Sequence, residues 1–454
     1  MSKPSIPQGT RDFPATVLRK RNHILSNIRQ VFELYGFQPL ETPAMENLET
    51  LMGKYGEEGD KLIFKVLNNG LGHEKNIEKA KAGFEKVLEG KSSADVTERA
   101  LKYDLTIPFA RYVAMNHAQL TFPYKRYQVQ PVWRADRPQR GRYREFTQCD
   151  ADVVGSTALI NEVELACIYD EAFARLGLTG YELLLNSRNI LLALAIAAGG
   201  AGQMTNISIA IDKLDKIGLD AVKEELAARD LTAEQITLIE QYLCISGSNE
   251  EKLAAIQQLL GVHTEAQKGI AELQYVLGRC GKVNAVVDFT LARGLNYYTG
   301  IIFEAKAPAT VKMGSIGGGG RYDDLTGLFG VPGIPGVGIS FGIDRIYDVL
   351  EEMNLFPEDL QTGTQVLFFN MGETEAGVAF ELMQELRQTG IPAELFHEPA
   401  KVGKQFTYAE KKGIPYVVII GSREAGEKVA QVKKLSNGDQ QTVAFAELAN
   451  YFKK

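Results

Sequence analysis

The stretch that most constrains the fold is residues 131–153, PVWRADRPQRGRYREFTQCDADV, where two runs of alternating apolar residues flank a loop dense in arginine. Alternation with a period of two residues is typical of half-buried strands, so this stretch predicts a strand, a long basic loop and a returning antiparallel strand. Guanidinium groups form forked, charge-assisted bonds to phosphate oxygens. The hairpin therefore either presents arginines to a phosphate-bearing ligand or is simply a solvated charged surface, and the stretch alone does not decide between these.

The two predicted strands would provide a rigid floor for a small polyanion. They carry Arg134, Phe146, Gln148 and Asp152. The connecting loop carries Arg137, Arg140 and Arg142, which suit a larger anion such as nucleic acid.

Length and composition limit the class of protein. At 454 residues the chain is too long for one ordinary domain, and its hydrophobic and charged fractions of 45% and 24% are typical of soluble globular proteins. No apolar run is long enough to span a bilayer and the N-terminus lacks the apolar core of a signal peptide, so we expect a cytoplasmic protein with no membrane partner. The net charge of -7 argues against wholesale coating by nucleic acid, although a cleft or loop can concentrate positive charge locally. The four cysteines show no paired spacing, so we expect neither a disulfide framework nor a metal site built from side chains.

The order of predicted elements divides the chain into four segments. Residues 1–189 and 283–356 contain antiparallel, glycine-punctuated strands with helices, and together they predict one core. Residues 190–282 form a succession of helices with little catalytic character, which indicates an inserted helical subdomain. Residues 364–454 alternate strand and helix in a βαβαβ order, which implies a parallel sheet and a separate α/β domain.

Elements near the N-terminus leave one alternative open. An amphipathic helix is predicted for residues 15–35, and the extended segment after it contains Pro39 and Pro43, which place it at a sheet edge. That edge is covered either by ordinary core packing or by a second subunit. Residues 61–67 are predicted as a strand, and residues 77–88 as a solvated surface helix.

Asp104 and Thr106 also allow two interpretations. On an extended segment, residues two apart face the same side, and a carboxylate beside a hydroxyl suits an ammonium group. The alternative is that the pair caps a helix before Pro108. Later in the chain, residues 283–305 predict two strands joined through Arg293 and Gly294.

Four successive glycines occur in residues 315–325, SIGGGGRYDDL. Such a run means that the backbone is approached closely, adopts positive φ, or both, and a tight turn is the simplest alternative. It is not a phosphate loop, because no lysine follows at the required spacing, and no strand and helix bracket it for dinucleotide binding. Alternation that turns into helical spacing after residue 338 places Arg345 in the first turns of a helix.

Taken together, the polar residues suit two kinds of ligand group. Three arginines on separate strand or helix starts suit a triphosphate: Arg134, Arg293 and Arg345. Groups for an ammonium are Asp104, Thr106 and Gln148, and groups for a polar side chain are Asp152, Tyr298 and Tyr322.

Seven motifs spread over nearly the whole chain resemble those of one family, the histidyl-tRNA synthetases of class II. In family order they are PQGTRDF, LETPAMEN, ALKYDLTIPFARYVA, PVWRADRPQRGRYREFTQCDAD, LARGLNYYTG, GGGGRYDDL and GISFGIDRI. The resemblance implies an α+β fold, in which the class II synthetase antiparallel sheet is flanked by helices. It also implies a helical insertion and a C-terminal α/β anticodon-binding domain.

The resemblance also assigns roles to individual residues. Arg293 and Arg134 would be catalytic. ATP would be bound by Arg134 at the α-phosphate, by Asp136, and by Phe146 and Arg345 around adenine. Histidine would be bound by Asp104, Thr106 and Gln148 at the amino group, by Asp152, Tyr298 and Tyr322 at the imidazole, and by Arg293 at the carboxylate. The tRNA acceptor end would meet Arg137, Gln139 and Arg140.

The reaction implied has two steps: histidine and ATP form histidyl-adenylate and pyrophosphate, and the terminal ribose of histidine tRNA then takes the histidyl group. Mg²⁺ would shield the pyrophosphate, and a homodimer is expected. Asn296 stands where many members have aspartate, which weakens any role for charge there. The alternative is a non-catalytic histidine-binding paralogue, such as the regulatory subunit of ATP phosphoribosyltransferase, but those proteins usually lack both the anticodon domain and the ATP arginines.

Overall fold

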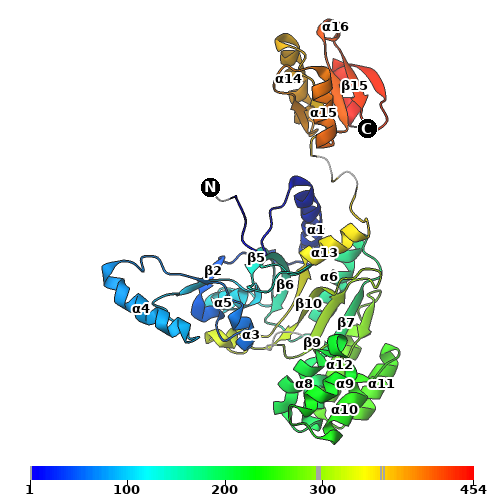
Figure 1. Cartoon of the computed structure of the whole chain (residues 1–454). Helices are drawn as coiled ribbons and strands as arrows, with labels where there is room; N and C mark the ends of the chain where they lie inside the picture. The colour runs from blue at the N-terminus through cyan, green and yellow to red at the C-terminus, as the bar shows by residue number, and fades with distance from the viewer. Residues whose placement is uncertain (1–2, 293–297, 358–359, 361–362, 454) are drawn as a thin grey trace. The chain divides into compact units, whose positions relative to one another are not determined.

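The computed structural model describes every residue except 1–2, 293–297, 358–359, 361–362 and 454 (Figure 1). The chain forms two compact units. The large unit comprises Met1–Asp12 and Arg21–Leu355, and the C-terminal unit comprises Phe13–Lys20 and Phe356–Lys454.

An eight-stranded sheet organises the large unit. Its strands, in spatial order, are β1 (Gln38–Pro39), β5 (Tyr124–Trp133), β6 (Glu145–Val154), β11 (Gly336–Gly342), β10 (Ser315–Tyr322), β9 (Ile301–Lys306), β7 (Glu182–Ser187) and β8 (Ala285–Val287). The pairs from β5 to β7 are antiparallel, and only the outer pairs β1·β5 and β7·β8 are parallel. The predicted hairpin is confirmed as β5 and β6, and the predicted proline-bearing edge is confirmed as β1.

The register of three central strands places polar residues side by side. Asp152 on β6 lies opposite Arg126 on β5 and Gly338 on β11. Two residues along, Asp150 lies opposite Gln128 and Ser340. Because alternate residues of a strand face the same side, these cross-strand rows share one face of the sheet.

The glycine run lies within β10, so the tight-turn interpretation is wrong. Residues 317–320 pair with both β9 and β11, and a close approach explains them. A Cβ on Gly317 would come within 2.7 Å of the Tyr169 ring on one face, and a Cβ on Gly320 would come within 2.8 Å of the Tyr298 ring. The strand therefore has atoms against it on both faces.

Helices pack on this sheet through apolar residues. They are α1 (Ala15–Leu34), α5 (Thr106–Asn116), α6 (Ile160–Arg175) and α13 (Ile343–Glu352). On α6, the buried Tyr169 lies 4.7 Å, between ring centroids, from Phe341 of β11, and its hydroxyl donates to the Ser340 carbonyl at 2.9 Å. The helix predicted for residues 15–35 is confirmed as α1, with a small difference at its end.

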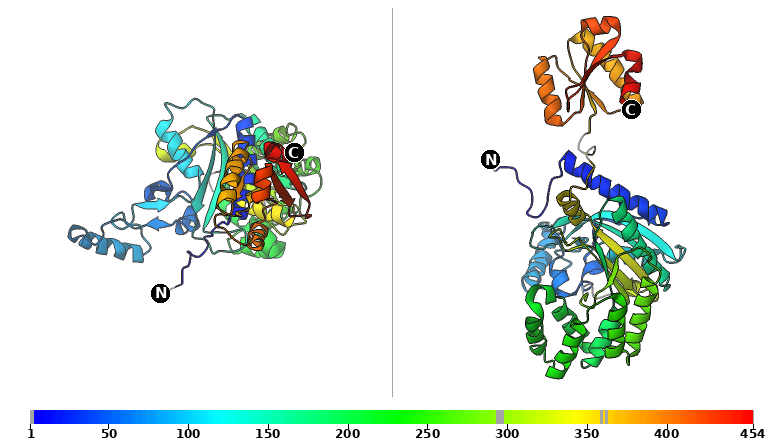
Figure 2. Two further views of the ribbon diagram at one scale, coloured as in Figure 1. Left: turned by 90° about the horizontal axis from the view of Figure 1, so that it is seen from above. Right: turned by 90° about the vertical axis from the view of Figure 1, so that its right-hand side faces the viewer.

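A smaller sheet adjoins the β1 side. It orders β2 (Met45–Asn47), β4 (Arg99–Leu101) and β3 (Lys65–Val66), with the short helices α2 (Leu48–Leu51) and α3 (Gly56–Lys61). The strand predicted for residues 61–67 is wrong at its start, because Lys61 ends α3 and only two residues pair. The predicted surface helix is α4 (Glu74–Leu88), which projects from the sheet in the left view of Figure 2.

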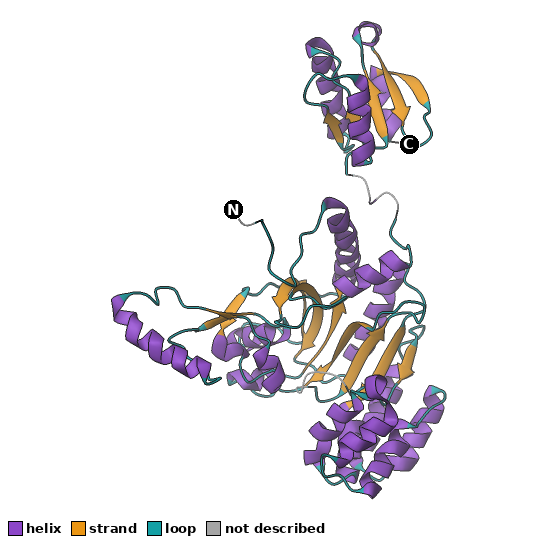
Figure 3. Cartoon of the chain, in the orientation of Figure 1, coloured by secondary structure: helices purple, strands orange, loops and turns teal. Residues whose placement is uncertain are grey.

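The predicted helical insertion is confirmed. It consists of α7 (Arg188–Ala197), η1 (Ala201–Gln203), α8 (Met204–Ile211), α9 (Leu214–Ala227), α10 (Ala233–Leu243), α11 (Asn249–Leu260) and α12 (Thr264–Leu277), the all-helical cluster of Figure 3. Capping boxes stabilise the starts of two of these helices, Thr232 with Gln235 at α10 and Ser248 with Glu251 at α11. None of the helices in the described part of the chain has both the length and the apolar composition that a membrane span requires. One bent pair of helices, α7 and residues 201–211, reaches that length and composition when the two are taken together.

The strands predicted within residues 283–305 exist as β8 and β9, but they lie on opposite sides of β7 rather than beside each other. The short 3-10 helix η2 (Leu325–Phe329) follows β10. The expected connection through Arg293 and Gly294 lies outside the described residues.

The C-terminal unit is the predicted α/β domain. Its sheet orders β13 (Ala393–Leu395), β12 (Val366–Phe368), β14 (Tyr416–Ile419), β15 (Val429–Lys434) and β16 (Gln440–Ala444), and β12 runs parallel to both neighbours. The helices are α14 (Glu373–Gln388), α15 (Val402–Lys412), α16 (Ser422–Glu427) and α17 (Leu448–Phe452), the last preceded by η4 (Phe445–Glu447). A hairpin joins β15 and β16, and Gly438 in its turn has a φ of +76°.

Candidate active site

Two adjoining cavities open on the polar face of the large sheet. The large cavity, of about 610 Å³, lies between the β5–β6 hairpin and the start of α13, and the small cavity has a volume of about 70 Å³. Residues lining both are Arg134, Gln148, Gly318 and Ser340. The two cavities therefore form one continuous site.

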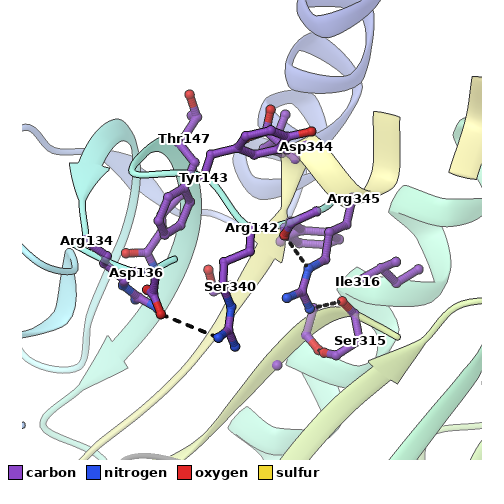
Figure 4. A pocket seen from close by; sticks show the side chains of 18 of the residues that line it. Arg134, Asp136, Arg142, Tyr143, Thr147, Ser315, Ile316, Ser340, Asp344 and Arg345 are labelled. Carbon is purple, nitrogen blue, oxygen red and sulfur yellow. Dashed lines mark hydrogen bonds and ion pairs between the residues drawn. The ribbon is translucent and has the colours of Figure 1, made fainter. Parts of the chain in front are cut away.

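The structure brings the residues predicted for ATP together around the large cavity. They are Arg134, Asp136, Phe146 and Arg345. Figure 4 labels Arg134, Asp136 and Arg345. The guanidinium carbon of Arg134 lies 4.3 Å from the centre of the Tyr103 ring and 5.2 Å from that of Phe146, while its Nε donates to the Tyr103 carbonyl at 3.0 Å. Aromatic faces on either side fix the orientation of the Arg134 charge.

Arg345 is held on the opposite wall by main-chain oxygens. Its Nη1 donates to the Ser315 carbonyl at 2.7 Å and its Nε to the Gly141 carbonyl at 3.1 Å (Figure 4). Its predicted place in the first turn of a helix is confirmed, because α13 begins at Ile343.

The loop residues predicted to meet tRNA lie outside both cavity linings. Arg137, Gln139 and Arg140 are exposed, and Arg140 pairs with Glu352 of α13 at 2.7 Å. Arg142, also on the loop, lines the large cavity and lies 3.5 Å from Asp136.

The small cavity gathers the residues predicted for histidine. Those described and lining it are Asp104, Thr106, Gln148, Asp152, Tyr298 and Tyr322. Arg293, predicted to be catalytic, lies outside the described residues.

Asp104 lies at the start of a helix and accepts a hydrogen bond from its first turn, so of the two interpretations of Asp104 and Thr106 the helix cap is the correct one. Its Oδ1 accepts from the Ile107 amide at 3.2 Å and from the Tyr55 hydroxyl at 2.8 Å, and α5 begins at Thr106. Its Oδ2 and the Oε1 of Gln148 are buried with no hydrogen-bond partner among the described residues. Buried acceptors without a donor are costly, so these two atoms point to a ligand that donates hydrogen bonds.

Asp152 is already paired within the protein. Its Oδ1 accepts from the Tyr322 hydroxyl at 2.6 Å, and its Oδ2 lies 2.8 Å from the Nη2 of Arg126. Gly338 leaves the space for this carboxylate, because a Cβ there would lie 2.0 Å from Oδ1. Arg126 itself is fully buried and stacks on the Phe109 ring at 4.1 Å.

Burial dominates the protonation of these carboxylates. It raises the pKa of Asp104 above the ordinary value, and it raises that of Asp152 against the opposing charge of Arg126. Asp150, which lines the same cavity and accepts from the Ser340 hydroxyl at 2.5 Å, has its pKa raised by burial to about 7. Burial likewise raises the pKa of Tyr298 and Tyr322, so both remain neutral hydrogen-bonding groups.

Sequence reasoning missed Asp150, Arg126 and Ser340. The signal for Asp150 was available, because it alternates with Gln148 and Asp152 and so faces the same side of β6. Arg126 was missed because the predicted hairpin begins at residue 131, whereas β5 begins at Tyr124 and so includes Arg126.

An antiparallel sheet flanked by helices, with arginines lining one cavity on it and carboxylates lining an adjoining one, is the arrangement expected of a class II aminoacyl-tRNA synthetase. Comparisons narrow the class. Residues 92–346 match the family model described as histidyl-tRNA synthetase, and residues 365–454 match that of an anticodon-binding domain. The chain belongs to the histidyl-tRNA synthetase family.

Individual relatives are similar to this chain over nearly all of its length. The chain is 50% identical to a histidine–tRNA ligase of Bacteroides fragilis, with 98% of each chain covered. The crystal structure of histidyl-tRNA synthetase from a Nostoc species superposes with a TM-score of 0.82 at 32% identity, covering 100% of this chain and 99% of that one. A Bacillus halodurans structure titled as an ATP phosphoribosyltransferase regulatory subunit/histidyl-tRNA synthetase has a TM-score of 0.72 at 22% identity, covers 92% of this chain and 99% of that one, and shares the fold.

Proposed function

We propose that this chain catalyses the ATP-dependent ligation of histidine to its tRNA. The observation that carries the proposal is the pair of unsatisfied acceptors, Asp104 Oδ2 and Gln148 Oε1, beside the aromatic-held charge of Arg134. An α-amino group supplies the donors that these oxygens lack, and a phosphate supplies the anion that Arg134 lacks. The amino acid and the nucleotide would thus meet where the cavities join.

Each wall has a part in the first step. Asp104, Thr106 and Gln148 would hold the amino group, while Asp152, Tyr298 and Tyr322 would bind the imidazole by hydrogen bonds. Arg134 and Arg293 would stabilise the charge that develops as the histidine carboxylate attacks the α-phosphate, releasing pyrophosphate. Phe146 and Arg345 would enclose adenine, with Asp136 beside it.

Mg²⁺ would enter with the nucleotide. The described residues contain no group of three or more His, Cys, Asp or Glu side chains arranged to hold a metal ion. Mg²⁺ commonly keeps several waters and is bound largely by substrate phosphates, a mode that needs no dedicated protein cage. It would neutralise phosphate charge, while the arginines orient the reacting group.

The second step requires the tRNA acceptor end to reach the same site. The exposed Arg137, Gln139 and Arg140 would contact it, and residues 364–454 would bind the anticodon. We also propose a cytoplasmic homodimer, with residues 1–189 and 283–356 as the catalytic core and 190–282 as the insertion. Light scattering coupled to size exclusion tests the dimer.

The regulatory-subunit alternative is not favoured. Curated histidine–tRNA ligases match this chain from end to end at about 50% identity, and a C-terminal segment matching the anticodon-binding family is present. The two arginines predicted to contact ATP within the described residues, Arg134 and Arg345, also line the large cavity.

The decisive experiment is exchange of labelled pyrophosphate into ATP. We expect exchange that depends on histidine and is not supported by other amino acids, because a side chain without the hydrogen-bonding groups of imidazole would leave the polar groups of Asp152, Tyr298 and Tyr322 without a ligand partner. Histidine binding measured calorimetrically without any exchange would overturn the proposal and restore the regulatory alternative.

A further inference from the structure

Residues 7–13, the N-terminal motif PQGTRDF, line neither cavity, but they contact the arginine-rich loop between β5 and β6. Gly9 accepts from the Arg144 amide at 2.9 Å, and a Cβ at Gly9 would lie 2.8 Å from Arg144 Cγ and 2.9 Å from Pro138 Cγ. The φ of Gly9 is +84°, a conformation that favours glycine. The N-terminal segment therefore packs closely against both sides of the loop.

The contact continues into the active site through the backbone of the loop. Arg144 accepts from the Arg134 amide at 2.9 Å, and the Nε of Arg144 donates to the Asp136 carbonyl at 3.1 Å. Arg134 and Asp136 both line the large cavity. The position of the N-terminal segment is thus coupled to the wall that carries these groups.

Arg11 connects that wall to the opposite one. Its guanidinium carbon lies 3.2 Å from the centre of the Tyr143 ring, and its Nη2 lies 2.5 Å from Asp344 Oδ1. Tyr143 belongs to the loop, whereas Asp344 belongs to α13 and precedes Arg345 (Figure 4). Both line the large cavity, while Arg11 does not.

Asp344 is itself held from a second direction. Arg21 of α1 pairs with the same Oδ1 atom, and Asp344 is buried. The carboxylate therefore provides a fixed point on α13, and Arg11 ties Tyr143 of the arginine-rich loop to it. A stacked and ion-paired guanidinium is more restrictive than either contact alone.

We propose that Arg11 is a positioning residue for the nucleotide, which fixes the arginine-rich loop against α13 and so sets the separation of the two walls of the large cavity. The proposal rests on the function proposed above. Loss of Arg11 would leave the loop tied to α13 through the Arg140–Glu352 pair and the Arg345–Gly141 bond, so its position would be less restricted. The nucleotide would then be bound in a wider range of orientations and the reacting groups would be aligned less often. Histidine, bound in the small cavity, would be little affected.

The test is steady-state pyrophosphate exchange by the full-length chain, with ATP and histidine varied separately. For Arg11→Ala we expect the KM for ATP to rise about tenfold, because one stacked ion pair is lost. The KM for histidine should change by less than about twofold. Arg11→Lys keeps the charge without the planar stack and should recover part of the ATP affinity. Arg175→Ala is the matched control, because Arg175 is 32% exposed against 28% for Arg11 and makes one ion pair, with Glu171, away from both cavities.

The outcomes separate the two proposals. Exchange by the wild-type chain with an unchanged KM for ATP in Arg11→Ala overturns the role of Arg11 alone, and so does an equal loss for both substrates. Absence of histidine-dependent exchange in the wild type overturns the proposed function itself. If Arg11→Ala fails to fold, the same comparison is made with Arg11→Lys, where an ATP KM equal to that of the wild type contradicts the need for stacking on Tyr143.

Discussion

The two cavities of the large unit adjoin each other but differ in the sign of charge that prevails in their linings. The large cavity presents Arg134, Arg142 and Arg345 beside two carboxylates, Asp136 and Asp344. The small cavity presents three carboxylates, Asp104, Asp150 and Asp152, and shares Arg134 with the large one. An excess of one sign of charge in a cleft concentrates ligands of the other sign. Phosphates are therefore drawn to the first, and ammonium or imidazole groups to the second.

The two sets of charges are also held differently. Arg134 and Arg345 donate to main-chain carbonyls in a cavity of about 610 Å³, while Asp152 is fixed by the buried side chains of Arg126 and Tyr322. Removing an arginine therefore leaves groups that water can reach. Changing Asp152 leaves buried side chains without partners, which costs more in binding and in folding.

The largest effect is expected for Arg134→Ala. Removing a positioned cation at the developing charge costs about 3 to 4 kcal/mol in the transition state, a fall of roughly 100- to 1,000-fold in kcat. Histidine affinity measured by calorimetry should change far less. The half-exposed Arg142→Ala is the control in the same cavity, with an expected loss below about tenfold. Equal losses for the two variants would remove Arg134 from catalysis.

Next in size is Asp152→Asn. Loss of a charge-assisted bond worth about 1.5 to 3 kcal/mol should raise the KM for histidine roughly 10- to 100-fold while leaving the KM for ATP nearly unchanged. Asp136→Asn in the large cavity should do the reverse. If Asp152→Asn raised both KM values alike, the two cavities would not be separate binding regions.

Asp150→Asn should change how stability depends on pH. Burial raises the pKa of Asp150 from 3.8 to about 7, so protonation stabilises the folded state, and this contribution is complete below the unfolded value and lost as pH rises through about 7. The stability of the wild type relative to the variant should fall by about 2 kcal/mol between about pH 5 and pH 8 in urea unfolding, since each pKa unit is worth about 1.4 kcal/mol. Arg126, Asp152 and Asp104 face this carboxyl in both proteins. A difference that does not vary with pH would mean that Asp150 keeps an ordinary pKa.

The smallest effect is expected on the loop outside both cavities. Replacing Arg137 and Arg140 by alanine should lower tRNA aminoacylation a few-fold, and more at low salt, with pyrophosphate exchange unchanged. Glu352→Gln is the control, because it frees Arg140 from its ion pair without removing the charge. A parallel fall in exchange would show that the loop arginines serve the cavities instead.

Much of this arrangement could be predicted from the sequence because its signals are local. Alternation predicted β5 and β6, helical spacing predicted the insertion, and motifs predicted the cavity residues. The partners of those residues depend on register between strands far apart in sequence, so Arg126 opposite Asp152 and Ser340 opposite Asp150 were not predicted. The reason for the glycine run could not be predicted either, because the side chains that approach it, Tyr169 and Tyr298, are distant in sequence or outside the strand.

The glycine run of β10 has a consequence for how substrate choice can vary. Residues 317–320 have neighbours on both faces of the sheet, and a Cβ on Gly319 would lie 2.1 Å from the Gly338 carbonyl. The glycine run therefore offers a ligand only its main chain, and a single substitution within it adds a clash before it adds a contact. Changes in which amino acid fits must come from positions whose side chains line the small cavity, which lie on β6, at the start of α5, at Tyr298 and at Tyr322.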